Sequence, residues 1–308
     1  MRPESKSAAG ACPLDSAEMV RLAILGFGLI GGSIARALAV REPGALHVTA
    51  WSRTPEGPRR AVEEGVVADA VADAAAAIAG ADLVVLAASP AANLALVERL
   101  GPALAASGGL LTDVTSVQAP IAARAAAVPG LRFVGGHPMS GRDRRGYAAA
   151  DAALFVDRPW VVLPGPRASS GDVDLVLRLA RACGALPLEL EPGVHDRAVA
   201  AISHVPLLAA VALVEAAVSA PDWPVARLLA AQGWRDATRL ARGDAELGAG
   251  ILATNAGAIA EALRRYRHEL ERWQMRIDAL IAAGDPAVAV PGLAADLART
   301  AAHIEPAT

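Results

Sequence analysis

Short apolar runs alternate with amphipathic segments through the first half of the chain. The runs that have the length of buried strands are residues 20–25, 46–51, 81–87, 110–113 and 131–134. Between them the apolar positions recur at helical spacing. Strands that alternate with helices at this rhythm predict an α/β fold with a doubly wound parallel sheet. A strand pair at 153–156 and 159–163 is expected to complete the sheet, and Pro164-Gly165-Pro166 is typical of a domain boundary.

The second half has a mostly helical pattern. It begins with an amphipathic segment at 172–183 and a short strand at 185–190, and a long apolar helix follows from about His195. The apolar run at 205–220 is broken by one glutamate and is shorter than a membrane-spanning helix needs, so we expect it to be buried in a core or a subunit interface. Residues 261–282 carry both charge signs, which indicates a surface or interface helix.

Composition narrows the functional classes. The 308 residues are 54% hydrophobic with a net charge of −3, so we expect neither a nucleic acid nor a membrane as a partner. The two cysteines, Cys12 and Cys183, have no metal or disulfide spacing, which fits a reducing cytoplasm. Residues 1–18 are polar and have no apolar signal core, so we expect a disordered extension, and Met19 could be the true start.

A glycine-rich stretch lies between the first predicted strand and the first predicted helix. Gly26, Gly28 and Gly31 form the pattern G-x-G-x-x-G in this position. The first glycine permits a tight turn, the second lets the backbone approach a pyrophosphate, and the third lets the helix pack closely on the strand. The pattern predicts a Rossmann-type dinucleotide site, with the cofactor in contact with Gly26, Gly28, Leu29, Ile30 and Gly31.

The residues after the next strands indicate which cofactor binds. An Asp or Glu usually follows the second strand and binds the free ribose 2′-hydroxyl of NAD. Here Ser52 and Arg53 follow it, and a hydroxyl with a guanidinium suits the 2′-phosphate of NADP. The alternative is that Arg53 is only a solvated surface charge. We therefore expect NADP rather than NAD, with Ser89 after the strand at 81–87 as a further cofactor contact.

Two candidate catalytic residues come after later strands. Ser116 follows the strand at 110–113. The stretch at 135–141 has three glycines and a proline, which predicts a tight loop that carries His137 at the end of the strand at 131–134. The carboxyl ends of parallel strands share one edge of a sheet, so both side chains can converge on the cofactor crevice. From this stretch alone, His137 fits a turn-capping role as well as a catalytic one.

Four residues of the helical half are candidates for substrate binding. His195 and His204 are nine residues apart, or about 900° on an unbroken α-helix, which predicts opposite faces. Pro206 is expected to kink this helix. Arg235 and Arg239 are one turn apart, so on one helix face they could clamp a dicarboxylic acid, or they could form a solvated basic face. We expect no metal site.

Together these motifs resemble the prephenate/arogenate dehydrogenase family of tyrosine biosynthesis. They occur in family order over about residues 19–255. The matching motifs are G-x-G-L-I-G-G-S at 26–33, T-D-V-T-S-V at 112–117, G-G-H-P-M-S-G at 135–141, H-D-R-A-V-A-A-I-S-H-V-P at 195–206 and R-D-A-T-R at 235–239. The resemblance implies an NAD(P)-dependent oxidative decarboxylation of arogenate or prephenate. It also implies a dinucleotide-binding domain at 19–165 and a helical substrate and dimerisation domain at 166–308, which forms a homodimer.

The resemblance also implies roles for individual residues. His137 matches the catalytic base, which is neutral until it takes the proton of the substrate hydroxyl, and Ser116 matches the serine that hydrogen-bonds and orients this base. Arg239 matches the arginine that binds a substrate carboxylate. His195 and His204 match histidines that line the substrate cleft. The ring gives a hydride to the nicotinamide and becomes aromatic when it loses carbon dioxide.

Three positions depart from the common family pattern. Leu207 stands where many prephenate-specific members have a second histidine, Gly248 where many have a tryptophan, and Gln118 where lysine is common. The first two departures resemble arogenate-preferring members, so we expect a preference for arogenate. Three alternatives stay open: a dehydrogenase for 4-amino-4-deoxyprephenate, a β-hydroxyacid dehydrogenase, and a non-catalytic NADP sensor. The second of these usually needs a catalytic lysine, and this chain has none beyond Lys6.

Overall fold

A computed structural model of the chain describes residues 20–142, 144–284 and 286–304. The predicted disordered extension at 1–18, with Cys12, lies outside the described residues, as does Met19. The chain divides into two compact units, Met1–Ile259 and Ala260–Thr308.

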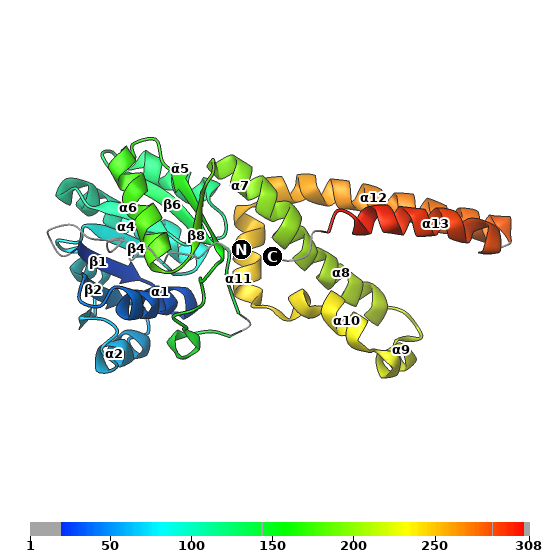
Figure 1. Ribbon diagram of the computed structural model, residues 1–308, viewed down its shortest axis with the longest axis horizontal. Coiled ribbons are helices and arrows are strands. Elements are labelled where there is room, and N and C mark those ends of the chain that lie inside the picture. Colours follow the sequence, from blue (N-terminus) through cyan, green and yellow to red (C-terminus); the bar gives the residue numbers. More distant parts are fainter. Residues whose placement is uncertain (1–19, 143, 285, 305–308) are drawn as a thin grey trace, which may run out of the picture. The chain divides into compact units, whose positions relative to one another are not determined.

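An eight-stranded sheet forms the centre of the first unit (Figure 1). The strands are β1 Val20–Leu25, β2 Leu46–Trp51, β3 Asp69–Ala70, β4 Leu83–Leu86, β5 Leu110–Asp113, β6 Arg132–Pro138, β7 Pro159–Pro164 and β8 Leu186–Glu189. Their order is β3-β2-β1-β4-β5-β6-β7-β8, and only β6 and β7 pair antiparallel. The predicted doubly wound, mostly parallel sheet is confirmed, and the strand order reverses between β1 and β4.

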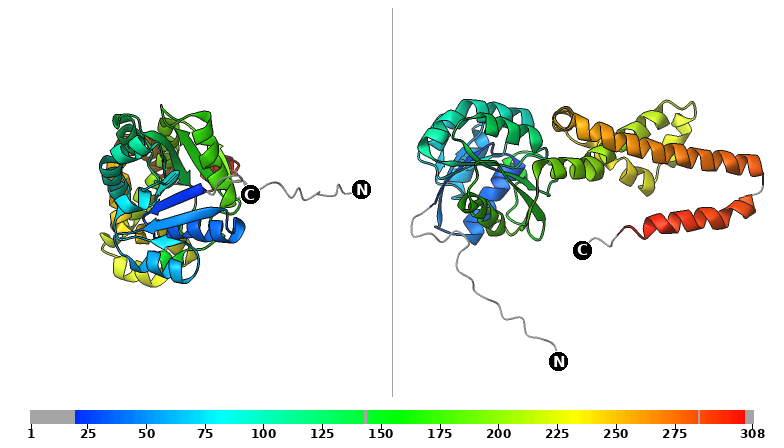
Figure 2. Two further views of the ribbon diagram at one scale, coloured as in Figure 1. Left: turned by 90° about the vertical axis from the view of Figure 1, so that its left-hand side faces the viewer. Right: turned by 90° about the horizontal axis from the view of Figure 1, so that it is seen from above.

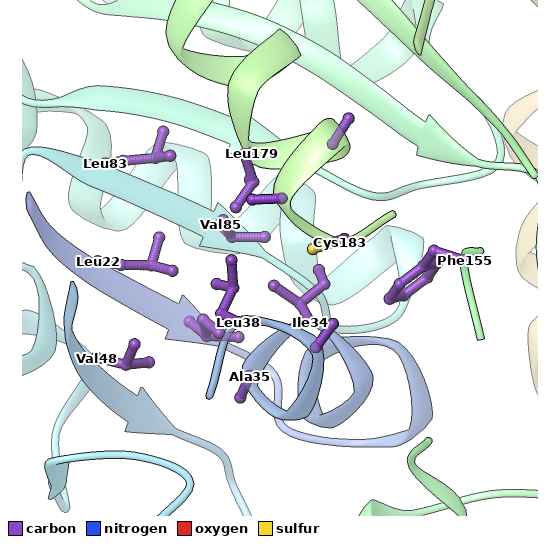
Figure 3. Packing of buried hydrophobic residues seen from close by; sticks show 14 of the residues in the cluster. Leu22, Ile34, Ala35, Leu38, Val48, Leu83, Val85, Phe155, Leu179 and Cys183 are labelled. Atoms are coloured by element: carbon purple, nitrogen blue, oxygen red, sulfur yellow. The ribbon is translucent and has the colours of Figure 1, made fainter. Parts of the chain in front are cut away.

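Helices cover both faces of this sheet (Figure 2). They are α1 Leu29–Arg41, α2 Glu56–Glu63, α3 Ala74–Ile78, α4 Pro90–Ser107, α5 Ala119–Ala127 and α6 Ser170–Ala182. One core lies between the sheet and α1 and α6, and a second lies between the sheet and α3, α4 and α5. Figure 3 shows side chains of the first core, among them Leu22, Ile34, Leu38, Leu83, Val85 and Leu179. Because both faces are covered, the central strands are continuous apolar runs rather than alternating ones.

The remaining elements are helical. In the first unit they are α7 Pro192–Val199, α8 Val205–Val218, α9 Trp223–Leu229, α10 Gln232–Ala237 and α11 Ala245–Thr254. Helix α12, Ala256–Ala283, begins at the end of this unit, and α13, Pro286–Ala301, lies in the second unit. Within the second unit an ion pair of 2.9 Å joins Arg276 of α12 to Asp296 of α13.

Two predictions about the end of the sheet were wrong. Residues 153–156 form turns rather than a strand, and their apolar side chains serve the core: Phe155 is buried with its ring centroid 5.2 Å from that of Trp160. The predicted boundary at residue 165 falls between β7 and β8, which pair in one sheet. The sheet therefore extends further along the chain than the mostly helical pattern after residue 165 indicates.

The glycine-rich stretch at 135–141 begins as a strand and not as the predicted loop. Gly135, Gly136 and His137 belong to β6 and pair with β7, and neither glycine has a positive φ angle. A Cβ atom on Gly135 would lie 2.2 Å from Oε1 of Gln118, and one on Gly136 would lie 2.6 Å from the carbonyl oxygen of Asp113. These glycines therefore allow close packing against the β5–α5 segment, which a turn signal in the sequence does not distinguish.

The long helix that carries His195 and His204 is not one α-helix. A π-helical turn, Ala200–His204, joins α7 to α8, and the N–H of Val205 donates to the carbonyl of Ala200. Pro206 lacks the N–H that would continue the α-helical ladder, so the helix is irregular here as predicted, although through a π turn. A π turn takes up about one extra residue, so the two histidines are separated by roughly 80° and not 180°. The expectation of opposite faces applied to an unbroken α-helix, and this helix is not one.

Candidate active site

The glycine-rich turn between β1 and α1 has the shape of a phosphate cradle. Gly26 has a φ of 98°, and a Cβ atom there would lie 2.4 Å from the backbone of Ala87. A Cβ atom on Gly31 would lie 2.2 Å from the carbonyl oxygen of Gly26. At Gly28, by contrast, a Cβ atom would meet nothing within 4 Å. The open space at Gly28, at the N-terminus of α1, therefore fits an approaching pyrophosphate.

A cavity of about 480 Å³ lies beside this turn, at the carboxyl ends of β1, β2 and β4. This is the place where the strand order reverses and where such sheets bind ligands. The lining residues are Gly26, Phe27, Gly28, Trp51, Ser52, Arg53, Thr54, Ala87, Ala88, Ser89, Ala92, Ala95, Leu96 and Arg99. Five of the predicted cofactor residues are therefore brought together here. Gly31 is buried inside α1, and Leu29 and Ile30 are half-buried at its start, packed against the core.

Arg99 is a cavity residue that sequence reasoning missed. It lies in the middle of α4, where it has no local motif around it. Its guanidinium carbon lies 5.9 Å from the centroid of the Trp51 ring, at the end of β2. Arg53 and Arg99 thus reach the same cavity from two elements far apart in the sequence, which only the packing of α4 on the sheet could indicate.

A chain of hydrogen bonds runs from His137 to a carboxylate on α7. Nδ1 of His137 lies 2.8 Å from Nε2 of His195, and Nδ1 of His195 lies 2.8 Å from Oδ1 of Asp196. His137 is half-buried, whereas His195 is 1% exposed. The two rings meet edge to face with centroids 5.0 Å apart. Asp196 was not among the predicted site residues, because nothing in the sequence places it next to His137.

The Asp196 carboxylate also holds the start of α5. It accepts hydrogen bonds from the backbone N–H groups of Gln118 and Ala119 at 2.8 and 2.7 Å. The side-chain amide of Gln118 donates to the carbonyls of Thr115 and Gly136 at 2.8 and 2.9 Å. Gln118, which stands where lysine is common, therefore ties the segment after β5 to the strand that carries His137.

Ser116 lies half-buried on the segment between β5 and α5. The described residues contain no hydrogen bond between Ser116 and His137. The ring of His137 is instead paired through Nδ1 with the His195 ring. A role for Ser116 in catalysis stays a prediction.

Burial lowers the pKa of two histidine rings at this site, His137 and His204. The pKa of His137 is lowered to about 3, first by burial and then by the nearby His195 and His204 rings, while Asp196 acts in the opposite direction. Burial also lowers the pKa of His204. Both rings are therefore neutral near neutral pH, as a proton acceptor must be. Burial raises the pKa of Asp113 to about 7, although N–H groups of Thr115, Gly136 and Gln118 bind its ionised form.

His204 and the two departures from the family pattern lie at the contact between α8 and α11. The side-chain amide of Asn255 donates to the carbonyl of Asp196 at 2.9 Å and contacts Nδ1 of His204 at 3.2 Å. Three residues after His204, Leu207 has its Cδ2 atom 3.6 Å from the position of a Cβ atom on Gly248. A side chain at position 248 would therefore contact Leu207, which lies one helical turn after His204.

The two arginines do not share one helix face, so that prediction was wrong. Helix α10 ends at Ala237, and Arg239 begins a 3₁₀-helix, Arg239–Arg242. Thr238 interrupts the α-helix, with its hydroxyl donating to the carbonyl of Trp234 at 2.7 Å. Arg235 and Arg239 are both exposed. Their substrate contacts stay predictions.

A glycine cradle and a neutral histidine at the carboxyl edge of a doubly wound sheet define a nicotinamide-dependent dehydrogenase. The described residues contain no cluster of His, Cys, Asp and Glu that could hold a metal ion. Residues 35–187 match the nucleotide-binding domain of prephenate dehydrogenase, and residues 191–285 match its dimerization domain. The chain belongs to the prephenate dehydrogenase family of NAD(P)-dependent oxidoreductases.

Individual relatives agree with this assignment. Prephenate dehydrogenase of Bacillus subtilis (strain 168) is 30% identical over 252 residues, which cover 81% of this chain and 68% of that protein. The crystal structure of Synechocystis arogenate dehydrogenase superposes with a TM-score of 0.75 at 27% identity, over 92% of this chain and all of that one. Prephenate dehydrogenase from A. aeolicus, in complex with hydroxyphenyl propionate and NAD+, has the same fold at 22% identity, with a TM-score of 0.79 over 93% of this chain and 99% of that one.

Proposed function

We propose that this chain oxidises and decarboxylates arogenate to tyrosine with NADP, and that prephenate is a poorer substrate. The observation that carries the substrate preference is that Leu207 and Gly248 lie close together, since a Cβ atom on Gly248 would be 3.6 Å from Cδ2 of Leu207. At these two positions many prephenate-specific relatives present an imidazole and an indole, which can donate hydrogen bonds. An apolar contact offers no such donor to the keto acid side chain of prephenate, whose polar groups would lose partners on leaving water.

His137 is the proposed base of the reaction. It takes the proton of the ring hydroxyl on Nε2, while the carbon that bears this hydroxyl gives a hydride to the nicotinamide, which supplies the electron acceptor when bound. The C–C bond to the ring carboxylate then breaks. Its electron pair enters the ring, carbon dioxide leaves, and the ring oxygen regains a proton from His137. Arg239 is the proposed contact for a substrate carboxylate.

Three residues of the cavity support the preference for NADP. Ser52 and Arg53 stand where an acid would bind the 2′-hydroxyl of NAD, and Arg99 adds a second guanidinium. Arg53→Ala and Arg99→Ala should each weaken NADP binding by about tenfold or more and leave NAD binding nearly unchanged. Arg59→Ala is the matched control, because Arg59 is exposed on α2 and does not line the cavity. Equal losses for both cofactors would contradict a role in binding the 2′-phosphate.

We further propose that the chain forms a homodimer through its helical part, which matches a dimerization domain. Exposed apolar side chains on α8 and α9 support this: Leu213, Val218, Val225, Leu228 and Leu229. By length and composition alone, the helical stretch Pro192–Val218 could also cross a membrane, and 28% of its apolar window is buried. Light scattering tests the dimer, and a mass of one chain at micromolar concentration would contradict it. The cytoplasmic location stays a prediction.

The decisive experiment is a comparison of initial rates with two substrates and two cofactors. Formation of reduced nicotinamide is measured with arogenate and prephenate, each with NADP and with NAD. The proposal expects the highest kcat/KM for arogenate with NADP. A higher kcat/KM for prephenate would refute the substrate preference, and turnover of 4-amino-4-deoxyprephenate alone would move the enzyme to specialised metabolism.

A variant at position 207 tests the reason for the preference. Leu207→His restores an imidazole, which should raise kcat/KM for prephenate relative to arogenate by about tenfold, the value of one good hydrogen bond. Leu186→His makes the same chemical change on β8, where Leu186 is 57% exposed, and should leave the ratio unchanged. An unchanged ratio in Leu207→His would show that Leu207 does not select the side chain.

A further inference from the structure

Both ring nitrogens of His195 are already bonded inside the protein. Nδ1 faces Asp196 and Nε2 faces His137, each at 2.8 Å, and the side chain is 1% exposed. A ring with no free nitrogen and no exposed surface has nothing to offer a substrate. His195 therefore does not fit the substrate-binding role that the family resemblance implied.

The hydrogen bonds also fix which nitrogen carries each proton. Asp196 accepts backbone N–H groups on both of its oxygens, from Gln118 on Oδ1 and from Ala119 on Oδ2. The carboxyl group is thus an acceptor on both sides, so Nδ1 of His195 must donate to it. A neutral His195 then has its lone pair on Nε2, and His137 must donate to that lone pair from Nδ1. This assignment follows from the network of partners.

His137 is left with an unprotonated Nε2 as the atom that can accept a proton. In the other neutral tautomer, Nε2 would carry a hydrogen and the ring could not act as a base at that atom. The titratable groups around the His137 ring are His195 and Asp196 of α7 and His204 of the π-helical turn, and Asp113 holds the neighbouring N–H of Gly136 at 3.1 Å. Asp196 is the group among these whose carboxylate is linked to His137 through a single ring.

We propose that Asp196 and His195 are positioning residues that hold His137 as the Nδ1–H tautomer and stabilise the imidazolium that forms during the reaction. The proposal rests on the role of His137 as the base of the proposed function. The O–H bond of the substrate breaks, an N–H bond forms at Nε2, and the electron pair left on oxygen forms the carbonyl as the hydride departs. The positive charge of His137 is then stabilised by the Asp196 carboxylate through His195.

An amide at position 196 tests the direction of these hydrogen bonds. In Asp196→Asn, one of the two oxygens becomes an NH₂ group. If this group faces Nδ1 of His195, that nitrogen must accept, Nε2 of His195 must donate, and the proton of His137 moves to Nε2. In that arrangement the NH₂ group also opposes the N–H of Gln118, which bonds the same oxygen, and in the other arrangement it opposes the N–H of Ala119, so each costs one hydrogen bond at the start of α5. We therefore expect both arrangements, and with them a mixture of the two neutral tautomers of His137.

Nitrogen-15 NMR of the histidine rings reads the tautomer without any substrate. The chain has 6 histidines, and His137→Gln assigns the signal of His137. We expect the Nδ1–H form of His137 in the unmodified protein and a mixture of the Nδ1–H and Nε2–H forms in Asp196→Asn. The exposed carboxylate of Asp174 on α6 gives a matched control, Asp174→Asn, which should leave the signal unchanged. A proton on Nε2 in the unmodified protein, or the Nδ1–H form alone in Asp196→Asn, would overturn the proposal.

Kinetics supply a second, independent readout. His195→Phe keeps a ring and removes both nitrogens, so kcat should fall by about 10² or more while KM stays within about threefold. A substrate-binding His195 would give a large rise in KM at nearly constant kcat, which would overturn the proposal. NADP affinity in the same variant checks that the cofactor cradle is intact. If the unmodified protein turns over none of the expected substrates, the proposed function fails, while the NMR result still decides the tautomer.

Discussion

Replacing Gly135 with alanine should disrupt the packing between β6 and the segment after β5. The added methyl group would stand 2.2 Å from Oε1 of Gln118, a distance that real side chains do not adopt. Gln118 is fully buried, and its amide donates to the carbonyls of Thr115 and Gly136. The amide can therefore not yield without losing hydrogen bonds.

The expected cost follows from these contacts. Loss of two hydrogen bonds costs about 1–3 kcal/mol, and overpacking of a buried site costs about 1–3 kcal/mol more. We therefore expect Gly135→Ala to lower the free energy of unfolding by about 2–6 kcal/mol. Gly250→Ala is the matched control: it adds the same methyl group on α11, where a Cβ atom meets nothing within 4 Å, and should stabilise the helix by up to about 1 kcal/mol.

A double-mutant cycle in urea unfolding separates this mechanism from a general loss of stability. Gln118→Ala removes the side chain that the new methyl group would strike. In that background Gly135→Ala should cost at least about 1 kcal/mol less than it does alone. Additive costs in the cycle, or a cost for Gly135→Ala as small as that for Gly250→Ala, would refute the reasoning from the Gln118 contact.

Two further predictions concern titration and reactivity. The pKa of His137 is lowered to about 3 in the folded protein. As the pH falls below 6.5, His137 therefore takes up a proton in the unfolded chain but stays neutral in the folded one. The folded state is thus most stable above pH 6.5 and loses stability as the pH falls. Between pH 6.5 and 5 this loss is about 2 kcal/mol. The urea midpoint of His137→Gln should therefore fall less with decreasing pH than the midpoint of the unmodified protein. An identical pH dependence of the two midpoints would contradict the prediction. Burial raises the pKa of the Cys183 thiol, which is fully buried, so in a Cys12→Ser background a thiol reagent should modify Cys183 only after unfolding. Rapid modification of the native protein, followed by mass spectrometry, would show that the core around α6 opens.

Features encoded locally could be predicted from the sequence. Buried strands of a parallel sheet are continuous apolar runs, and the glycines of the phosphate cradle lie within a few residues of one another. Both patterns can therefore be recognised without knowledge of the fold. The glycine pattern and the end of the second strand led to the cofactor residues around Gly26 and Arg53, and the family resemblance gave His137 its expected role.

What could not be predicted depends on residues that are distant in the sequence. The glycines at 135 and 136 indicated a turn, because the Gln118 side chain and the Asp113 carbonyl that demand their small size lie in another segment. The π turn before Pro206 rotates all later residues about the helix axis. A calculation that assumes 100° per residue does not include this rotation. Asp196 reaches His137 only through the fold, as Arg99 reaches the cavity at Arg53.

The carboxylate of Asp196 also limits which segments of this protein can be exchanged with those of its relatives. It lies in the segment that matches the dimerization domain, yet it accepts the backbone N–H groups at the start of α5, in the segment that matches the nucleotide-binding domain. A chimera that joins the two segments from different relatives keeps this helix end only if the donor supplies an acid at the position of Asp196. The two halves are therefore not interchangeable parts, and recombination between relatives has to carry this contact across the junction.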